Sequence, residues 1–233
     1  MKKKIAIVAG GDSSEHEVSL RSAAGILSFM DAERYDCRIV AQRGQSMHVL
    51  DGEHQYPVNL HDFSYEVDGK RQTFDFAYIT IHGTPGENGI LQGYFDLIGL
   101  PYSTSGVLVE ALTFNKFALN NYLRTLPGIH VSDSLMVRRG QTLPTPEEVV
   151  ERVGLPCFIK PNAGGSSFGV SKVKALEEVI PAIHKAMDES DEVMIERQLV
   201  ATEITCGCFR RQNADVVCFP ITELALKGVE LFD

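Results

Sequence analysis

The chain has 233 residues, a hydrophobic content of 44%, a charged content of 23% and a formal net charge of -9. Such a composition is typical of a globular protein and supplies an ample core for one large or two modest domains. The acidic balance argues against a nucleic-acid partner, which would need clustered lysine and arginine. No stretch approaches the ~18 apolar residues of a membrane span. We therefore expect a cytoplasmic protein with no nucleic-acid or membrane partner.

The predicted elements of the first part of the chain alternate between strand and helix. In chain order they are a strand at 5–9, a helix at 12–30, a strand at 36–41, a hairpin at 63–74, a strand at 74–81, a helix at 88–99 and a short strand at 100–104. The hairpin is indicated by Asp68-Gly69, a strong turn signal between alternating residues. This order predicts one doubly wound α/β domain over residues 1–104.

From residue 105 onward strands follow one another without obligatory crossover helices. The predicted elements are helices at 105–126, 145–153 and 175–190, and strands at 130–137, 155–160, 169–173, 192–199, 202–209 and 215–224. Pro181 would cost about 3 kcal/mol in a helix interior, so its helix either kinks there or restarts with Pro181 in the first turn. We expect a mostly antiparallel α+β domain at 105–200 and the start of a further domain at 201–233.

The five cysteines are scattered and odd in number. They are Cys37, Cys157, Cys206, Cys208 and Cys218. Most lie in apolar, strand-like runs such as GLPCFIK and DVVCFPI, a pattern typical of reduced thiols in a protein core. Cys206 and Cys208 could begin a zinc site, but no second cysteine pair or close histidine pair completes it. Alternate positions on a strand are the better interpretation, and we expect no metal ligand in this chain.

Residues 159–170, IKPNAGGSSFGV, place a lysine before a loop of glycines and serines. The usual phosphate-binding loop has its lysine after the glycines. Here the loop lies between two predicted strands, so its backbone N–H groups and hydroxyls can close over a phosphate chain as a lid. Lys160, on the strand beside it, would supply the cation. The alternative is a mobile hairpin with a solvated lysine.

Two further segments have polar residues where predicted strands end. Glu196 and Gln198 share one face at a strand end, where they could contact an adenine rim and a ribose hydroxyl. His82 follows the strand at 74–81, at the carboxyl end where ligands bind in open α/β sheets. The alternatives are a satisfied core histidine for His82 and a helix-start carboxylate for Glu87.

The segment GGDSSEHEVSL also follows a strand, and it carries Glu15 three residues after Asp12. Ligands bind at this edge of open α/β sheets, so Glu15 is a candidate site residue. The alternative is a capping box, with Asp12 as the helix N-cap and Glu15 reaching back to it.

Taken together, five motifs resemble those of D-alanine–D-alanine ligases of the ATP-grasp superfamily. They are GGDSSEHEVSL, HGTPGENGILQG, FNK at 114–116, IKPNAGGSSFGVSKV, and MIERQL followed by TEIT. They occur in the family's order and at its intervals over essentially the whole chain. The resemblance implies an N-terminal doubly wound parallel-sheet (pre-ATP-grasp) domain, followed by an α+β ATP-grasp domain that is incomplete in this chain.

The resemblance also implies an enzyme that joins two D-alanines to D-alanyl-D-alanine for bacterial peptidoglycan. In this family the first carboxylate attacks the γ-phosphate of ATP, and the second D-alanine's amine then attacks the resulting acylphosphate, so ADP and phosphate are released. The implied partners are D-alanine, ATP, Mg²⁺ and a second subunit in a homodimer. Ligases that use D-lactate or D-serine as second substrate, and a non-catalytic nucleotide- or D-alanine-binding module, remain alternatives.

The resemblance also implies roles for individual residues, at the positions where this sequence matches the family's motifs. Glu15 would bind the ammonium of the first D-alanine, His82 would lie beside its carboxylate, and Ser166 would join a hydrogen-bond chain with Glu15 that orients the site. The implied nucleotide residues are Lys116, Lys160, Ser166 and Ser167 for the phosphates, Glu196, Gln198 and Leu199 for the adenine, and Glu203 for the ribose. Gln198 departs from the aromatic residue of some relatives, which puts adenine stacking in doubt.

Several family features do not occur in residues 1–233. These are a lysine-tyrosine loop, an arginine that stabilises the tetrahedral intermediate, and an Asp-Glu-Asn set that binds two Mg²⁺ ions. We therefore expect the chain to lack most of the C-terminal domain, and the Mg²⁺ ligands to lie beyond residue 233.

Overall fold

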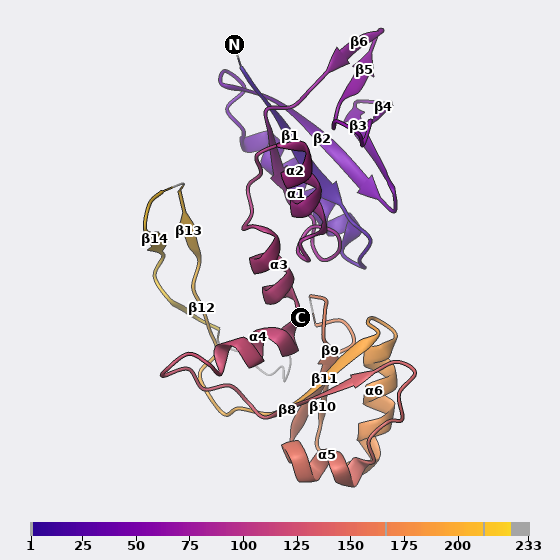
Figure 1. The fold of residues 1–233 in the computed structure, drawn as a ribbon, viewed down its shortest axis with the longest axis vertical. Helices are drawn as coiled ribbons and strands as arrows, with labels where there is room; N and C mark the ends of the chain where they lie inside the picture. Colours follow the sequence, from indigo (N-terminus) through magenta and orange to yellow (C-terminus); the bar gives the residue numbers. More distant parts are fainter. Residues whose placement is uncertain (1, 166, 212, 225–233) are drawn as a thin grey trace. The chain divides into compact units, whose positions relative to one another are not determined.

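The computed structural model describes residues 2–165, 167–211 and 213–224. The chain forms two compact units (Figure 1). The first comprises Met1–Ile129 with Asn162–Gly165, and the second comprises His130–Pro161 with Ser166–Asp233. The division into domains at residues 104 and 200 stays a prediction.

The first unit is built on a five-stranded sheet in the order β4-β3-β2-β1-β7. Its strands are β1 (Lys3–Gly10), β2 (Tyr35–Arg43), β3 (Ser46–Asp51), β4 (His54–Pro57) and β7 (Phe76–Ile79). Both β2 and β7 run parallel to β1, which confirms the predicted parallel centre. The antiparallel strands β3 and β4 were not predicted, and they make this sheet mixed at one edge.

Helices cover both faces of this sheet, as a doubly wound domain requires. They are α1 (His16–Phe29) and α2 (Ile90–Ile98). Strand β1 is buried on both sides, because Ile5 and Ile7 pack in the cluster that contains Ala23 of α1, whereas Ala6 and Val8 pack in the cluster that contains α2. Helix α1 confirms the helix expected at 12–30, although it begins at His16 and two of its apolar residues, Val18 and Leu27, are exposed.

The predicted hairpin is confirmed as β5 (Tyr65–Val67) and β6 (Lys70–Gln72), joined by Asp68 and Gly69 with φ angles of 50° and 70°. The short strand expected at 100–104 is reduced to an isolated bridge between Ala77 and Tyr102. The single helix expected at 105–126 is two helices, α3 (Val107–Phe114) and α4 (Lys116–Leu123). They are separated by Asn115, whose backbone is extended.

The second unit has a four-stranded sheet in the order β10-β9-β11-β8, antiparallel throughout as predicted. Its elements are β8 (Ser134–Arg138), α5 (Pro146–Val153), β9 (Cys157–Pro161), β10 (Ser171–Val173), the 3-10 turn η1 (Leu176–Glu178), α6 (Val179–Met187) and β11 (Glu192–Arg197). Both α5 and α6 pack on one face of this sheet (Figure 1). Pro181 lies in the first turn of α6, so the helix restarts rather than kinks.

Two short ribbons follow β11. They consist of β12 (Ile204–Thr205) with β15 (Thr222–Glu223), and β13 (Cys208–Arg210) with β14 (Val216–Cys218). The strands expected at 202–209 and 215–224 are therefore each interrupted. Three cysteines there, Cys206, Cys208 and Cys218, are exposed, so the expected burial holds only for Cys37 and Cys157. No helix in the described part of the chain is long and apolar enough to cross a membrane.

Candidate functional site

Two glycine-containing loops meet at the carboxyl end of β1. Gly10 and Gly11 have φ angles of 99° and 96°, and a Cβ on Gly10 would lie 2.4 Å from the carbonyl oxygen of Gln42, so a side chain cannot be accommodated there. The Ser13 hydroxyl donates to the His82 carbonyl at 2.7 Å and accepts from the Glu15 amide at 3.2 Å. Ser13 thus links the Glu15 and His82 loops, a role that no local sequence signal predicted.

Glu15 does not act as a helix cap. It occupies the N-cap position of α1, but its side chain makes no capping hydrogen bond. The carboxylate of Asp12 instead accepts from the Gly44 amide at 2.7 Å, so the capping-box alternative is wrong. The Glu15 side chain is buried, at 9% exposure, and its Oε2 would lie 2.9 Å from a Cβ built on Gly165. A buried carboxylate beside the glycine loop is suited to a cationic ligand group.

His82 lies in the loop after β7 and is partly buried. Its imidazole makes no hydrogen bond to any residue that the structure describes, so it does not fit the alternative of a satisfied core histidine. Glu87 accepts from the Gly83 amide at 2.6 Å and closes this loop on itself. Since α2 begins after its N-cap Gly89, Glu87 organises the His82 loop rather than the helix start.

Lys116 is the first residue of α4, and its ammonium donates to the Gly164 carbonyl at 2.8 Å. Gly164 belongs to the glycine loop, so two motifs that lie 48 residues apart in sequence are in contact. The predicted phosphate-binding lysine of the first unit is therefore next to the loop predicted to cover the phosphates.

In the second unit Lys160 and Glu196 lie on neighbouring strands, β9 and β11, and form an ion pair. Their side chains are only 22% and 16% exposed, and Glu196 also lies 3.4 Å from the Ser132 hydroxyl. The neighbouring positions Ile159 and Ile195 point into the core with α5 and α6. Because side chains alternate along a strand, Lys160 and Glu196 lie on the face without helices.

The remaining predicted residues lie around the end of β11 and in the glycine loop. The backbone N–H of Gln198 donates to the Pro156 carbonyl at 3.2 Å, and Leu199 and Glu203 are exposed. Ser167 has a φ angle of 57°, in the left-handed region. Ser166 lies outside the described residues, so its predicted role has no structural account.

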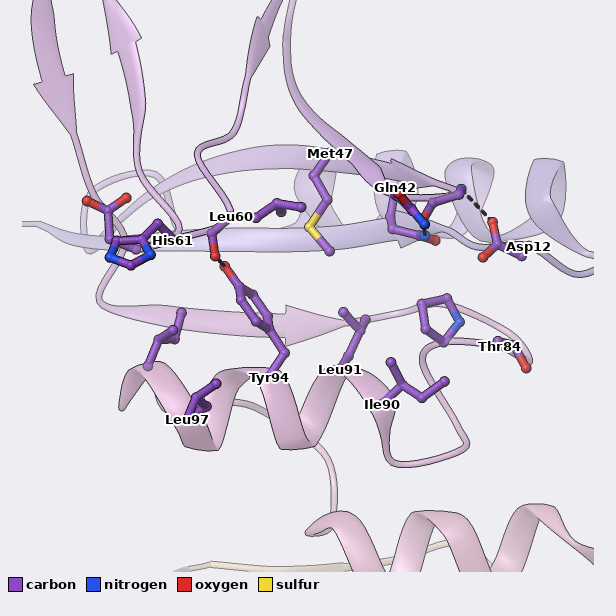
Figure 2. A pocket seen from close by; sticks show the side chains of 15 residues that line it. Asp12, Gln42, Met47, Leu60, His61, Thr84, Ile90, Leu91, Tyr94 and Leu97 are labelled. Carbon is purple, nitrogen blue, oxygen red and sulfur yellow. Dashed lines mark hydrogen bonds between the residues drawn. The ribbon is translucent and has the colours of Figure 1, made fainter.

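A separate apolar cavity of about 820 Å³ opens in the first unit. Figure 2 shows Met47 and Leu60 facing Leu91 and Tyr94 of α2, with Asp12 at one end. The Tyr94 hydroxyl donates to the Leu60 carbonyl at 2.8 Å. None of the residues predicted to bind substrate or nucleotide lines this cavity, so it is distinct from the candidate site.

Comparison with known proteins identifies the class to which this fold and site belong. Residues 4–105 match the family described as D-ala D-ala ligase N-terminus, and residues 123–233 match D-ala D-ala ligase C-terminus. The chain therefore belongs to the D-alanine–D-alanine ligase family, which confirms the resemblance seen in its motifs.

Individual relatives agree with this family. The chain is 59% identical over its whole length to a D-alanine–D-alanine ligase of Phocaeicola vulgatus and 54% identical to one of Bacteroides fragilis, and it spans 71% of each. Among solved structures it is similar to D-alanyl-alanine synthetase A from Vibrio cholerae, with a TM-score of 0.84 and 26% identity, over 97% of this chain and 68% of that one.

Proposed function

We propose that this chain contributes the substrate- and nucleotide-binding residues of a bacterial cytoplasmic enzyme that joins two D-alanines with ATP. The products are D-alanyl-D-alanine for peptidoglycan, ADP and phosphate. The observation that carries the proposal is the buried carboxylate of Glu15, which caps no helix; the backbone amide of Glu15 is linked through the Ser13 hydroxyl to the His82 loop. Family membership over both matched regions supports the same reaction.

The chemistry explains why these residue types are needed. A carboxylate is a poor electrophile, so transfer of a phosphoryl group to the first D-alanine supplies a leaving group before the second amine attacks. Glu15 binds the ammonium of the first D-alanine, and His82 lies beside its carboxylate. The glycine loop, with Ser166 and Ser167, excludes water from the acylphosphate, which would otherwise hydrolyse.

Lys116 and Lys160 bind the phosphates, and each has a different partner in this structure. Lys116 donates to the Gly164 carbonyl, and Lys160 is paired with Glu196. Because an ammonium group has three N–H donors, each lysine can add phosphate oxygens to its present partner or exchange that partner for them when ATP binds. Such exchange is favourable, because a phosphate offers several charged acceptors in place of one.

The adenosine part of ATP is bound by residues at and after the end of β11. These are Glu196, Gln198 and Leu199 for the adenine and Glu203 for the ribose. Bound Mg²⁺ would neutralise charge on the phosphates. The family resemblance implies that the Mg²⁺ ligands lie beyond residue 233, and the described residues hold no group of three or more His, Cys, Asp or Glu that could bind a metal ion.

D-alanine is the second substrate that the relatives favour, since those at 59% and 54% identity are both D-alanine–D-alanine ligases. The test uses the full-length polypeptide with ATP and Mg²⁺, and D-alanine alone or mixed with D-lactate or D-serine. Phosphate release should rise with D-alanine, and mass spectrometry should find the D-alanyl-D-alanine dipeptide. Phosphate release that is independent of D-alanine would contradict the proposal.

We also infer that the protein acts as a homodimer, supported by exposed apolar side chains around the cavity of Figure 2. Leu97 and Ile90 of α2 are 85% and 58% exposed, and a contiguous apolar surface of this kind marks an interaction site. Leu97→Asp should convert the dimer to a monomer in light scattering. Phe29→Asp, at a 91% exposed position on α1, is the matched control and should leave the dimer intact.

A further inference from the structure

The first turn of α4 is capped by a residue distant in sequence. Helix N-termini leave N–H groups without partners inside the helix. In α4 the Lys116 amide donates to the Asn162 carbonyl at 3.1 Å, and the Phe117 amide donates to Asn162 Oδ1 at 2.9 Å. The Ala118 amide donates to Asn115 Oδ1 at 2.9 Å. Two asparagines thus share the capping of one helix, one from within its own segment and one from 45 residues away.

Asn162 is also the first residue of the glycine loop. It directly follows Pro161, the last residue of β9, and its side chain is 0% exposed. Two residues later the Gly164 carbonyl accepts from the Lys116 ammonium at 2.8 Å. Lys116 therefore makes two hydrogen bonds to this loop. Its backbone N–H donates to the Asn162 carbonyl, and its ammonium donates to the Gly164 carbonyl.

We propose that Asn162 is a positioning residue for nucleotide binding. By docking the start of the glycine loop on the N-terminus of α4, it fixes the Lys116 ammonium relative to the loop that covers the phosphates. This role rests on the proposed function, in which Lys116 and the loop bind the ATP phosphates.

The chemistry at residue 162 is specific. Docking uses both a backbone carbonyl and a short side-chain acceptor from one buried residue. Alanine keeps the carbonyl but removes Oδ1, which leaves the Phe117 amide without its partner. Aspartate keeps an acceptor at the same position, and a carboxylate is favourable at a helix N-terminus. Asn162→Asp should therefore preserve the docking that Asn162→Ala loses.

Asn115 supplies a matched control for a purely structural role. Asn115→Ala removes a side-chain cap from the same helical turn, but the bond that it removes does not involve the glycine loop. If Asn162 is only a cap, the two alanine variants should behave alike. If it positions Lys116 and the loop, only Asn162→Ala should impair nucleotide binding beyond its effect on stability.

The experiment measures binding of a non-hydrolysable ATP analogue to the full-length polypeptide by calorimetry, together with melting temperature and amide hydrogen exchange. Both alanine variants should lower the melting temperature. Only Asn162→Ala should weaken analogue binding, by about fivefold or more, which corresponds to the free energy of one lost helix cap. It should also speed exchange at Phe117 and in residues 163–165, and Asn162→Asp should restore both properties.

Three results would overturn the proposal. They are unchanged analogue affinity in Asn162→Ala, equal loss of affinity in Asn115→Ala, and absence of analogue binding to the wild-type protein. Failure of the proposed function is distinguishable, because it would appear as analogue binding without D-alanine-dependent phosphate release.

Discussion

Lys160 and Glu196 form an ion pair diagonally across β9 and β11. The family resemblance predicts different ligands for them, a phosphate for Lys160 and the adenine for Glu196. In the strand register Lys160 faces Met194 and Glu196 faces Phe158, so the pair spans two adjacent positions on one face. Both side chains are mostly buried. Each therefore compensates the charge of the other while no nucleotide is bound.

Lys160→Met should lower the free energy of unfolding as well as nucleotide affinity. Removing the ammonium leaves the Glu196 carboxylate poorly solvated and without its counter-ion, which costs about 1–3 kcal/mol. The double variant Lys160→Met/Glu196→Gln should recover most of this stability, because no unpaired charge remains. Urea denaturation of the single and double variants measures the effect. Equal stability of the wild type and Lys160→Met would mean that the pair contributes nothing.

Glu15→Gln should weaken binding of the first D-alanine and barely change stability. Its carboxylate makes no capping hydrogen bond, so the substitution removes no cap, and a cap is worth only about 1 kcal/mol. Loss of the charge that binds the substrate ammonium should raise KM for the first D-alanine by about tenfold or more, since charged hydrogen bonds contribute about 1.5–3 kcal/mol. Steady-state kinetics and thermal melting of the full-length polypeptide provide the two measurements.

Asp12→Asn is the control for this substitution. Asp12 lies in the same loop and its carboxylate accepts from the Gly44 amide, a bond that an asparagine oxygen can also accept. The control should change KM little. A Glu15→Gln protein with unchanged KM for D-alanine, or with a much lower melting temperature, would show that Glu15 is structural.

The sequence predicted the helices, strands and turns that depend on residues close to one another in the chain. The continuous burial of β1 and the Asp68-Gly69 turn follow from nearby residues, and so does the capping box of α5, where Thr145 and Glu148 bond reciprocally. The break between α3 and α4 was missed. The apolar pattern continues through Asn115, and part of the cap that starts α4 comes from distant Asn162.

In the candidate site, too, the sequence did not predict features that depend on residues distant in the chain. The motifs predicted which residues belong to it, but not the bonds among them. The Lys160–Glu196 pair depends on strand register, and the bond from the Gly44 amide to the Asp12 carboxylate depends on the turn between β2 and β3. Strands β3 and β4 were missed because their segments, SMHVLD and HQYP, are short and contain no continuous apolar run.

The stability of the second unit should fall between about pH 9 and pH 11 because of Cys157. Burial raises the pKa of this thiol from its ordinary value of 9.0 to about 11. In that window the unfolded chain has lost the thiol proton and the folded chain retains it, so the unfolded state binds fewer protons. The free energy of unfolding therefore decreases as pH rises, by at most about 1.4 kcal/mol per pH unit for one proton.

Urea denaturation at pH 8, 9 and 10 of the wild type and of Cys157→Ala measures this contribution. The variant should be less stable at pH 8, because it leaves a space in the core, but its stability should decline less steeply above pH 9. Other groups with raised pKa values, such as Cys37 and Tyr94, are common to both proteins and cancel in the comparison. Parallel declines would show that Cys157 is not responsible.

A polypeptide made of residues 1–233 alone should not ligate D-alanine, whereas one extended to the length of its relatives should. Phosphoryl transfer from ATP depends on Mg²⁺ to neutralise the phosphates, and the family resemblance implies that the Mg²⁺ ligands lie beyond residue 233. The ribbon of β13 and β14 also exposes apolar side chains, with Val216 and Val217 at 56% and 46%, so this polypeptide should associate at high concentration. Phosphate release at increasing D-alanine, with intact mass and light scattering as checks, compares the two polypeptides. Release from the 233-residue polypeptide that rises with D-alanine would place the metal-binding residues within this chain and refute the expectation that they lie beyond it.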